Sequence, residues 1–166
     1  MNKVSRIKNS FGKNFVNEGT SNEYSQDRYI LDNTRKFYLF DICPVGAVRM
    51  TKRDRIFTNP NHADPLKRQR KAVTMYFEFK NSLTAQALQM DYVLGETLDA
   101  VYLLPMPDSW SEKKKARMNG FAHKSTPDTD NITKGFCDAL KSQDSDVWYQ
   151  KAQKYWAYRG SIIIFD

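Results

Sequence analysis

Residues Thr126 to Leu140 (TPDTDNITKGFCDAL) carry the side chains that could do chemistry. Asp128 and Asp130 precede a stretch that predicts a helix, Asn131 to Leu140, with Lys134 in its first turn. Two carboxylates and an ammonium at a helix start are suited to hold a divalent metal and a phosphate group. The alternative interpretation is an ordinary turn in which Asp130 is the N-cap of the helix.

Lys134 favours the functional interpretation over the simple turn. A cation in the first turn is opposed by the helix dipole and contributes nothing to a cap. An i, i+4 pair with Asp130 would offset this by only about 0.2–0.5 kcal/mol.

Further acids lie at Asp138, within the predicted helix, and at Asp144 and Asp146, after it, although the formal net charge of the chain is +7. A short helix followed by a returning strand would bring Asp144 or Asp146 back towards the first two carboxylates. Clustered acids in a basic chain indicate a metal site that faces a polyanion.

Three segments of the chain resemble the RusA family of phage and prophage Holliday-junction resolvases. They are Leu104 to Lys115 (LPMPDSWSEKKK), Pro127 to Lys134 (PDTDNITK), and Asp138 to Leu140 together with Asp144 to Trp148. The Asp-x-Asp-Asn-x-x-Lys motif of the family is matched by Asp128, Asp130, Asn131 and Lys134. A later Asp-Asp-x-x-Val-type segment, aligned on Val147, places an acid at Asp144. Gln143 replaces the first acid of that pair, so Asp146 is a substitute ligand.

The resemblance implies an endodeoxyribonuclease that resolves four-way branched DNA by paired phosphodiester hydrolysis in recombination or repair. It implies a homodimer in the cytoplasm of a bacterial host cell, encoded by a phage or prophage. The implied catalytic residues are Asp128, Asp130, Lys134 and Asp144, of which the three aspartates would bind Mg²⁺, or Mn²⁺ as an alternative. Elementary chemistry agrees, because Mg²⁺ prefers a few hard oxygen ligands and activates water near a phosphodiester. Lys134 would then stabilise negative charge in the transition state.

Other kinds of site fail on spacing. An EF-hand loop would need an oxygen ligand at Ile132 and a glycine after it. His62 and His123 lie far apart without zinc-ligand partners, and we interpret both as surface or backbone-satisfied histidines. Cys43 and Cys137 are predicted to be reduced, buried thiols. No small-molecule cofactor is expected.

Two basic segments are candidates for contact with the DNA backbone. The first is a predicted loop, Pro44 to Lys71, and the second is a short predicted helix, Ser109 to Met118, with Ser109 as its cap and Trp110 as an anchor or a stacking platform. The alternative for both is a solvated surface. The candidate phosphate ligands are Arg49, Lys52, Arg53, Arg55, Lys113, Lys114, Lys115 and Arg117.

The remaining elements predict an α+β fold, with a small mixed sheet covered by helices. Strands are expected at Phe37 to Cys43, Leu98 to Leu104, Val147 to Tyr158 and Ser161 to Phe165, the last two joined by a turn at Arg159-Gly160. A core-facing helical stripe is expected at Val73, Tyr76, Phe77, Leu83, Ala87 and Met90. Residues 1–35 are expected to be a flexible or loosely docked arm, and residues 36–166 the nuclease domain.

Two other functions remain open at this point. One is a non-catalytic phage DNA-binding protein in which the carboxylates only cap and turn. The other is a nuclease of forks or flaps. No segment is apolar over a length that would span a bilayer, and no membrane partner is expected. For the homodimer, we expect Trp148 or Trp156 to be buried between the subunits, against the alternative of a monomer that buries them in its own core.

Overall fold

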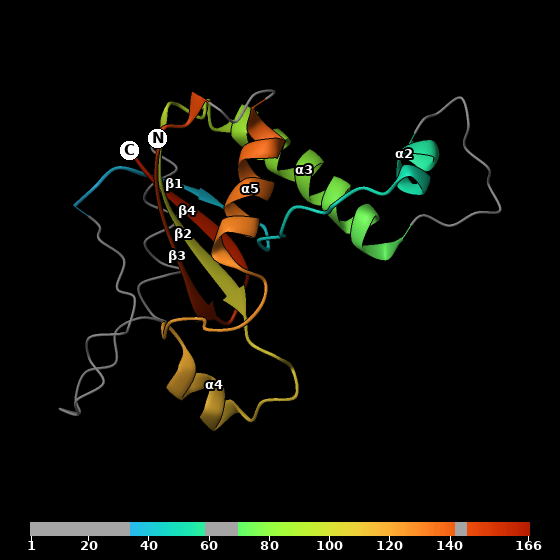
Figure 1. The fold of residues 1–166 in the computed structure, drawn as a ribbon. Coiled ribbons are helices and arrows are strands. Elements are labelled where there is room, and N and C mark those ends of the chain that lie inside the picture. The colour runs from blue at the N-terminus through green and yellow to red at the C-terminus, as the bar shows by residue number, and fades with distance from the viewer. Residues whose placement is uncertain (1–33, 59–69, 142–145) are drawn as a thin grey trace.

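The computed structural model describes residues 34–58, 70–141 and 146–166, which form helices around one four-stranded sheet (Figure 1). In chain order the elements are β1 (Phe37–Phe40), α2 (Lys52–Thr58), α3 (Lys71–Gln89), β2 (Thr97–Pro105), α4 (Glu112–Met118), α5 (Thr129–Leu140), β3 (Tyr149–Ala157) and β4 (Ser161–Phe165). No helix in these ranges is both long and apolar enough to cross a membrane.

The sheet is mixed, with the strand order β1-β4-β2-β3. At its centre, Ala100 of β2 pairs with Ala152 of the parallel β3 and with Ile164 of the antiparallel β4. Parallel neighbours need a crossover connection, and α4 and α5 lie within it. The predicted α+β class with a mixed sheet is therefore confirmed.

β3 and β4 follow one another along the chain but are not neighbours in the sheet, because β2 lies between them. The residues 158–160 that join them pass the end of β2, where the Met106 N–H donates to the Ala157 carbonyl at 3.0 Å. β3 thus becomes an edge strand. Just before it, the Trp148 N–H donates to the Glu96 carbonyl at 3.0 Å, next to the start of β2.

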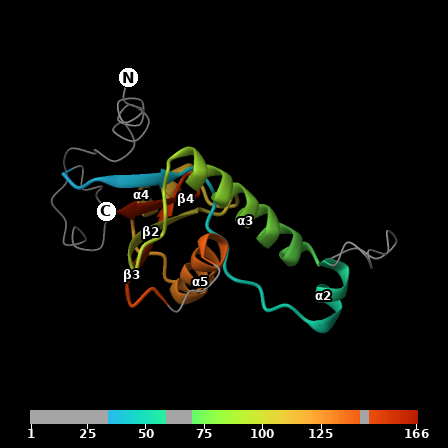
Figure 2. The ribbon, with the colours of Figure 1, turned by 90° about the horizontal axis from the view of Figure 1, so that it is seen from above.

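The main core lies between one face of the sheet and helices α3 and α5 (Figure 2). On α3, the buried side chains recur every three or four residues, as expected of an amphipathic helix: Val73, Tyr76, Phe79, Leu83 and Ala87. The prediction missed Phe79 and was wrong for Phe77, which is only half-buried and lies outside the core cluster. Met90 is half-buried and packs against the core, as predicted. Phe40 of β1 meets Phe136 of α5 edge to face, with ring centroids 5.8 Å apart.

Most of the predicted arm, residues 1–33, lies outside the described residues. Its last part is tied to the sheet. Arg35 forms an ion pair with Asp99 at 2.8 Å, and its guanidinium lies 4.4 Å from the ring centroid of Phe165.

Candidate functional site

Asp128 is the N-cap residue of α5, and its side chain makes no capping hydrogen bond. The alternative interpretation, in which Asp130 is the N-cap, was wrong, because the helix begins at Thr129 and Asp130 lies inside its first turn. Both aspartates are exposed. An N-cap carboxylate normally accepts a backbone N–H of the first turn. The Asp128 carboxylate is not engaged in this way, so it is available to a ligand.

A lysine from the sheet holds the turn that leads into α5, residues 125–130, which is the carboxylate turn. Lys154 of β3 donates from Nζ to the carbonyl of Ser125 at 2.5 Å and to that of Pro127 at 2.7 Å. The two carbonyls lie on either side of Thr126, whose peptide bond to Pro127 is cis. The sequence carried no signal for this contact, since Lys154 is one of several polar residues in an alternating strand.

Two glycines allow the segment 45–47 to lie directly on α5. A Cβ at Gly135 would come within 2.6 Å of the Val45 carbonyl oxygen and 3.0 Å of the Ala47 nitrogen. The Ala47 N–H donates to the Asn131 carbonyl at 2.9 Å, and Gly46 lies against the Asn131 side chain. The motif residue Asn131 thus contributes to this packing contact.

Lys134 lies in the second turn of α5, because the helix starts earlier than predicted. The prediction that it lies in the first turn was wrong, and the helix dipole opposes its charge only weakly, since that effect fades beyond the first turn. Its Nζ pairs with Asp138 Oδ1 at 3.3 Å, and Tyr76 of α3 donates to Asp138 Oδ2 at 3.2 Å. Burial and the neighbouring Asp138 raise the pKa of Tyr76, which keeps its hydroxyl protonated as a donor.

Asp146 follows the C-terminal end of α5, whereas Asp128 precedes its N-terminal end. The 12 residues of the helix separate its ends by about 18 Å. Asp146 lies 3.9 Å from Lys141, just after the helix, and the Trp148 N–H donates to Glu96 before β2. Within one chain the structure does not bring Asp146 to the carboxylate pair. Asp144 lies outside the described residues.

Within residues 34–58, 70–141 and 146–166, no group of three or more His, Cys, Asp or Glu side chains could hold a metal ion. Among the predicted ligands, Asp128 and Asp130 both lie at the start of α5, with Thr129 between them in the chain.

The basic helix α4 lies at the same end of the sheet as the start of α5 (Figure 1). Its N-cap is Ser111, which accepts a hydrogen bond from the Lys114 N–H at 3.3 Å, so the prediction of Ser109 was wrong. Lys113 and Arg117 are exposed. Lys114 lies 3.8 Å from the ring centroid of Trp110, and Lys115 pairs with Glu112 at 3.0 Å.

Trp110 anchors the loop before α4 rather than standing free. Its ring centroid lies 5.0 Å from that of Trp156 on β3. Trp156 also contacts His123, with ring centroids 3.9 Å apart. His123 is buried, so the surface alternative of its interpretation was wrong, whereas the backbone-satisfied alternative stays a prediction. His62 lies outside the described residues. Burial, followed by the nearby Lys154 charge, lowers the pKa of His123.

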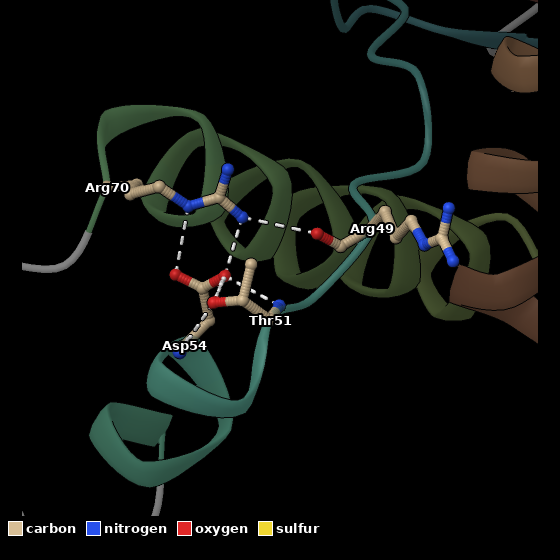
Figure 3. Close-up of polar contacts among 4 residues, drawn as sticks. All are labelled: Arg49, Thr51, Asp54 and Arg70. Atoms are coloured by element: carbon tan, nitrogen blue, oxygen red, sulfur yellow. Dashed lines mark hydrogen bonds and ion pairs between the residues drawn. The ribbon is translucent and has the colours of Figure 1, made fainter.

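The predicted basic loop contains a helix, α2, which an ion pair ties to α3 (Figure 3). Asp54 is only 2% exposed and accepts Arg70 Nε at 3.0 Å and Nη2 at 2.5 Å, with Thr51 donating from its N–H and hydroxyl. These bonds, above all those from Arg70, hold the pKa of Asp54 well below its usual range. Arg49, Lys52, Arg53 and Arg55 remain exposed around this pair.

One of the two cysteine predictions was also wrong. Cys137 is buried on α5 as expected, whereas Cys43 is exposed after β1. Both are free thiols.

The family model described as Endodeoxyribonuclease RusA matches residues 47–164, which include α2, the carboxylate turn, α4 and most of the sheet. No curated protein and no solved structure matches the chain. The family match confirms the resemblance and decides against a non-catalytic DNA-binding protein. The chain belongs to the RusA family of endodeoxyribonucleases and is a crossover junction endonuclease that resolves Holliday junctions.

Proposed function

We propose that the protein makes paired cuts in four-way DNA, with Asp128 and Asp130 as ligands of Mg²⁺ and Lys134 beside the scissile phosphate. The observation that carries this proposal is the N-cap position of Asp128 without a capping hydrogen bond, next to the exposed Asp130. An N-cap carboxylate that makes no capping hydrogen bond is better explained by a ligand. Asp144 is the third ligand in this proposal.

The two carboxylates fit the metal. Mg²⁺ keeps several waters and is usually held by one or two carboxylates together with substrate phosphates. Both side chains are exposed, which leaves room for the waters and for DNA. When bound, the ion supplies Lewis-acid activation of the phosphodiester and of the attacking water. Mn²⁺ accepts the same oxygen ligands.

The chain itself supplies the electrostatics around the phosphate. The first turn of α5 presents backbone N–H groups and the positive end of the helix dipole, which favour an anion. Lys134 reaches solvent while Asp138 restrains its ammonium, and Tyr76 in turn orients Asp138. In this arrangement Lys134 stabilises negative charge that develops on the phosphate oxygens.

The cations outside this centre bind the DNA backbone. On α4, Lys113 and Arg117 are exposed, and in this proposal they contact phosphates close to the cut. The basic side chains on and before α2 (Arg49, Lys52, Arg53 and Arg55) lie at the far end of α3 and contact a more distant stretch (Figures 1 and 2). Phosphate contacts position the duplex without reading its sequence. The phage or prophage origin that the family resemblance implies leads us to propose the cytoplasm of a bacterial host cell as its location.

Two centres related by a two-fold axis suit a junction with two symmetry-related strands, which supports a homodimer. Trp148 is 74% exposed and lies beside the exposed Tyr149 at the start of the edge strand β3. It is the better candidate for burial between subunits, because Trp156 already packs within its own chain.

The test compares three charge-neutralising variants in cleavage of a synthetic four-way junction, with fork, flap and linear duplex of the same sequence beside it. Asp128→Asn and Asp130→Asn should abolish cleavage and leave junction affinity equal or higher, because removal of negative charge weakens metal ligation but reduces repulsion of phosphate. Asp146→Asn is the matched control, since it removes an exposed aspartate at the other end of α5. Full activity in Asp130→Asn would refute the proposed site.

Mixed dimers test both the pairing of cuts and the origin of the third ligand. A dimer of wild type with Asp130→Asn should nick one strand of the symmetric pair. In a dimer of Asp130→Asn with Asp144→Asn, no centre is intact if Asp144 serves its own chain, whereas one centre is intact if it serves the partner. The two outcomes differ in which chain supplies Asp144, and α5 separates its own two ends by about 18 Å.

A further inference from the structure

Lys154 is the residue of the sheet that contacts the carboxylate turn. Its ammonium donates to the Ser125 and Pro127 carbonyls, and the second of these immediately precedes Asp128. Lys154 pairs with Tyr102 across β2 and β3, so its Cα belongs to the most regular part of the fold. Two charge-assisted hydrogen bonds from the half-buried Lys154 side chain thus hold the turn against β3.

The backbone of β3 holds the other side of the same loop. The His123 N–H donates to the Lys154 carbonyl at 3.0 Å, and the Trp156 N–H donates to the Phe121 carbonyl at 2.9 Å. The chain from Phe121 to Asp128 is therefore attached to β3 at both its beginning and its end. Loss of the Lys154 side chain would release only the end that carries the aspartates.

A separate attachment on β3 serves the basic helix. Trp156 lies two residues after Lys154 and therefore on the same face of the strand. Its ring supports Trp110, whose ring in turn lies under the Lys114 ammonium. The aspartates and the α4 cations are thus located relative to one strand by two different side chains.

We propose that Lys154 is a positioning residue for the Asp128–Asp130 metal site, while Trp110 positions the α4 cations for DNA. This inference rests on the proposed function of the two aspartates. Lys154 acts through the direction in which the chain enters α5, and it touches neither substrate nor metal. Residues that orient metal ligands in this way typically change metal affinity or activity by about 10- to 100-fold when replaced.

The test uses the full-length protein and measures metal binding directly, by calorimetric titration with Mg²⁺ and Mn²⁺ without DNA. Lys154→Met keeps the aliphatic stem and removes the donors, and we expect metal affinity to fall about 10- to 100-fold. Single-turnover cleavage should fall at limiting Mg²⁺ and recover at high Mg²⁺, with metal-free junction affinity unchanged. Lys154→Arg retains donors and should recover part of the metal affinity.

Lys151→Met is the charge-matched control. Lys151 lies on the same strand but pairs with Asp99, at 3.6 Å, and not with the carboxylate turn. It should bind metal as the wild type does. Trp110→Ala should show the converse pattern, with weaker junction binding and unchanged metal affinity.

Metal affinity in a folded Lys154→Met that equals the wild-type value would overturn the inference. If Lys154→Met does not fold, Lys154→Leu, which also has an aliphatic side chain and no donor, is judged by the same criterion. Asp128→Asn distinguishes a failure of the proposed metal site from a failure of the positioning role of Lys154. If it binds metal as the wild type does, the proposed site itself fails; if it loses metal while Lys154→Met does not, only the positioning role fails.

Discussion

Replacement of Gly135 by alanine should have two opposite effects on stability, a gain in helix propensity and a steric clash with the segment 45–47. Gly135 lies inside α5, where alanine is favoured over glycine by about 1 kcal/mol in an exposed helix. Here, however, the new Cβ would meet the Val45 carbonyl oxygen at 2.6 Å and the Ala47 nitrogen at 3.0 Å. Both are backbone atoms, which cannot rotate away as the end of a long side chain can.

The steric effect should win. Overpacking typically costs about 1–3 kcal/mol, and a retreat of residues 45–47 strains the Ala47 to Asn131 hydrogen bond, worth about 0.5–1.5 kcal/mol. After subtraction of the helix-propensity gain, we expect the free energy of unfolding to fall by about 1–3 kcal/mol. For a chain of this size that lowers the Tm by roughly 3–10 °C.

Urea unfolding followed by circular dichroism measures the change. Gly95→Ala is the control, because a Cβ at Gly95 has no atom within 4 Å and should leave stability nearly unchanged. If Gly135→Ala is as stable as the wild type, or more stable, the close approach of residues 45–47 to α5 is not a real constraint.

Three further predictions concern charge. Lys113→Ala should weaken junction binding and reduce its salt dependence more than Lys115→Ala does, because Lys115 already pairs with Glu112; equal salt slopes in fluorescence-anisotropy titrations would contradict this. Lys134→Ala should lower the single-turnover cleavage rate far more than junction affinity, and a loss of affinity alone would make Lys134 a phosphate anchor. Because the pKa of Asp54 is lower in the folded than in the unfolded protein, its ionised carboxylate stabilises the fold above the unfolded-state pKa of about 4. This stabilisation is lost as the pH falls below that value and towards the folded-state pKa. Urea midpoints of wild type and Asp54→Asn should therefore differ most at neutral pH and converge at acid pH, and a constant difference would show that the ion pair with Arg70 does not carry the effect.

The local elements were predictable because their signals are local. The stripe of Ile132 and Phe136 indicated α5, and the apolar run before Pro105 indicated β2. The ends of helices were less accurate. Ser109 and Ser111 are both good caps, and Asp128 and Asp130 are both good N-terminal residues, so the choice between them depends on how the loop before each helix packs.

The contacts that position the site could not be predicted in this way. Lys154 reaches a carbonyl 29 residues away, and Arg70 reaches Asp54 across 16 residues. Nothing in an alternating strand or a basic loop marks which polar side chain turns inward. Such pairs exist only after the strand and the helix have their final neighbours.

The sequence by itself determined the chemical groups and their order along the chain: paired aspartates before an amphipathic helix, a lysine within it, and basic segments on both sides. These follow from residue type and periodicity, which act over a few residues. Only the tertiary structure decided that β2 separates β3 from β4, and that α5 runs from the carboxylate pair to Asp146 at its far end. The physical reason is that strand order and helix direction are set by burial of apolar faces across the whole sheet, a property that no local segment contains.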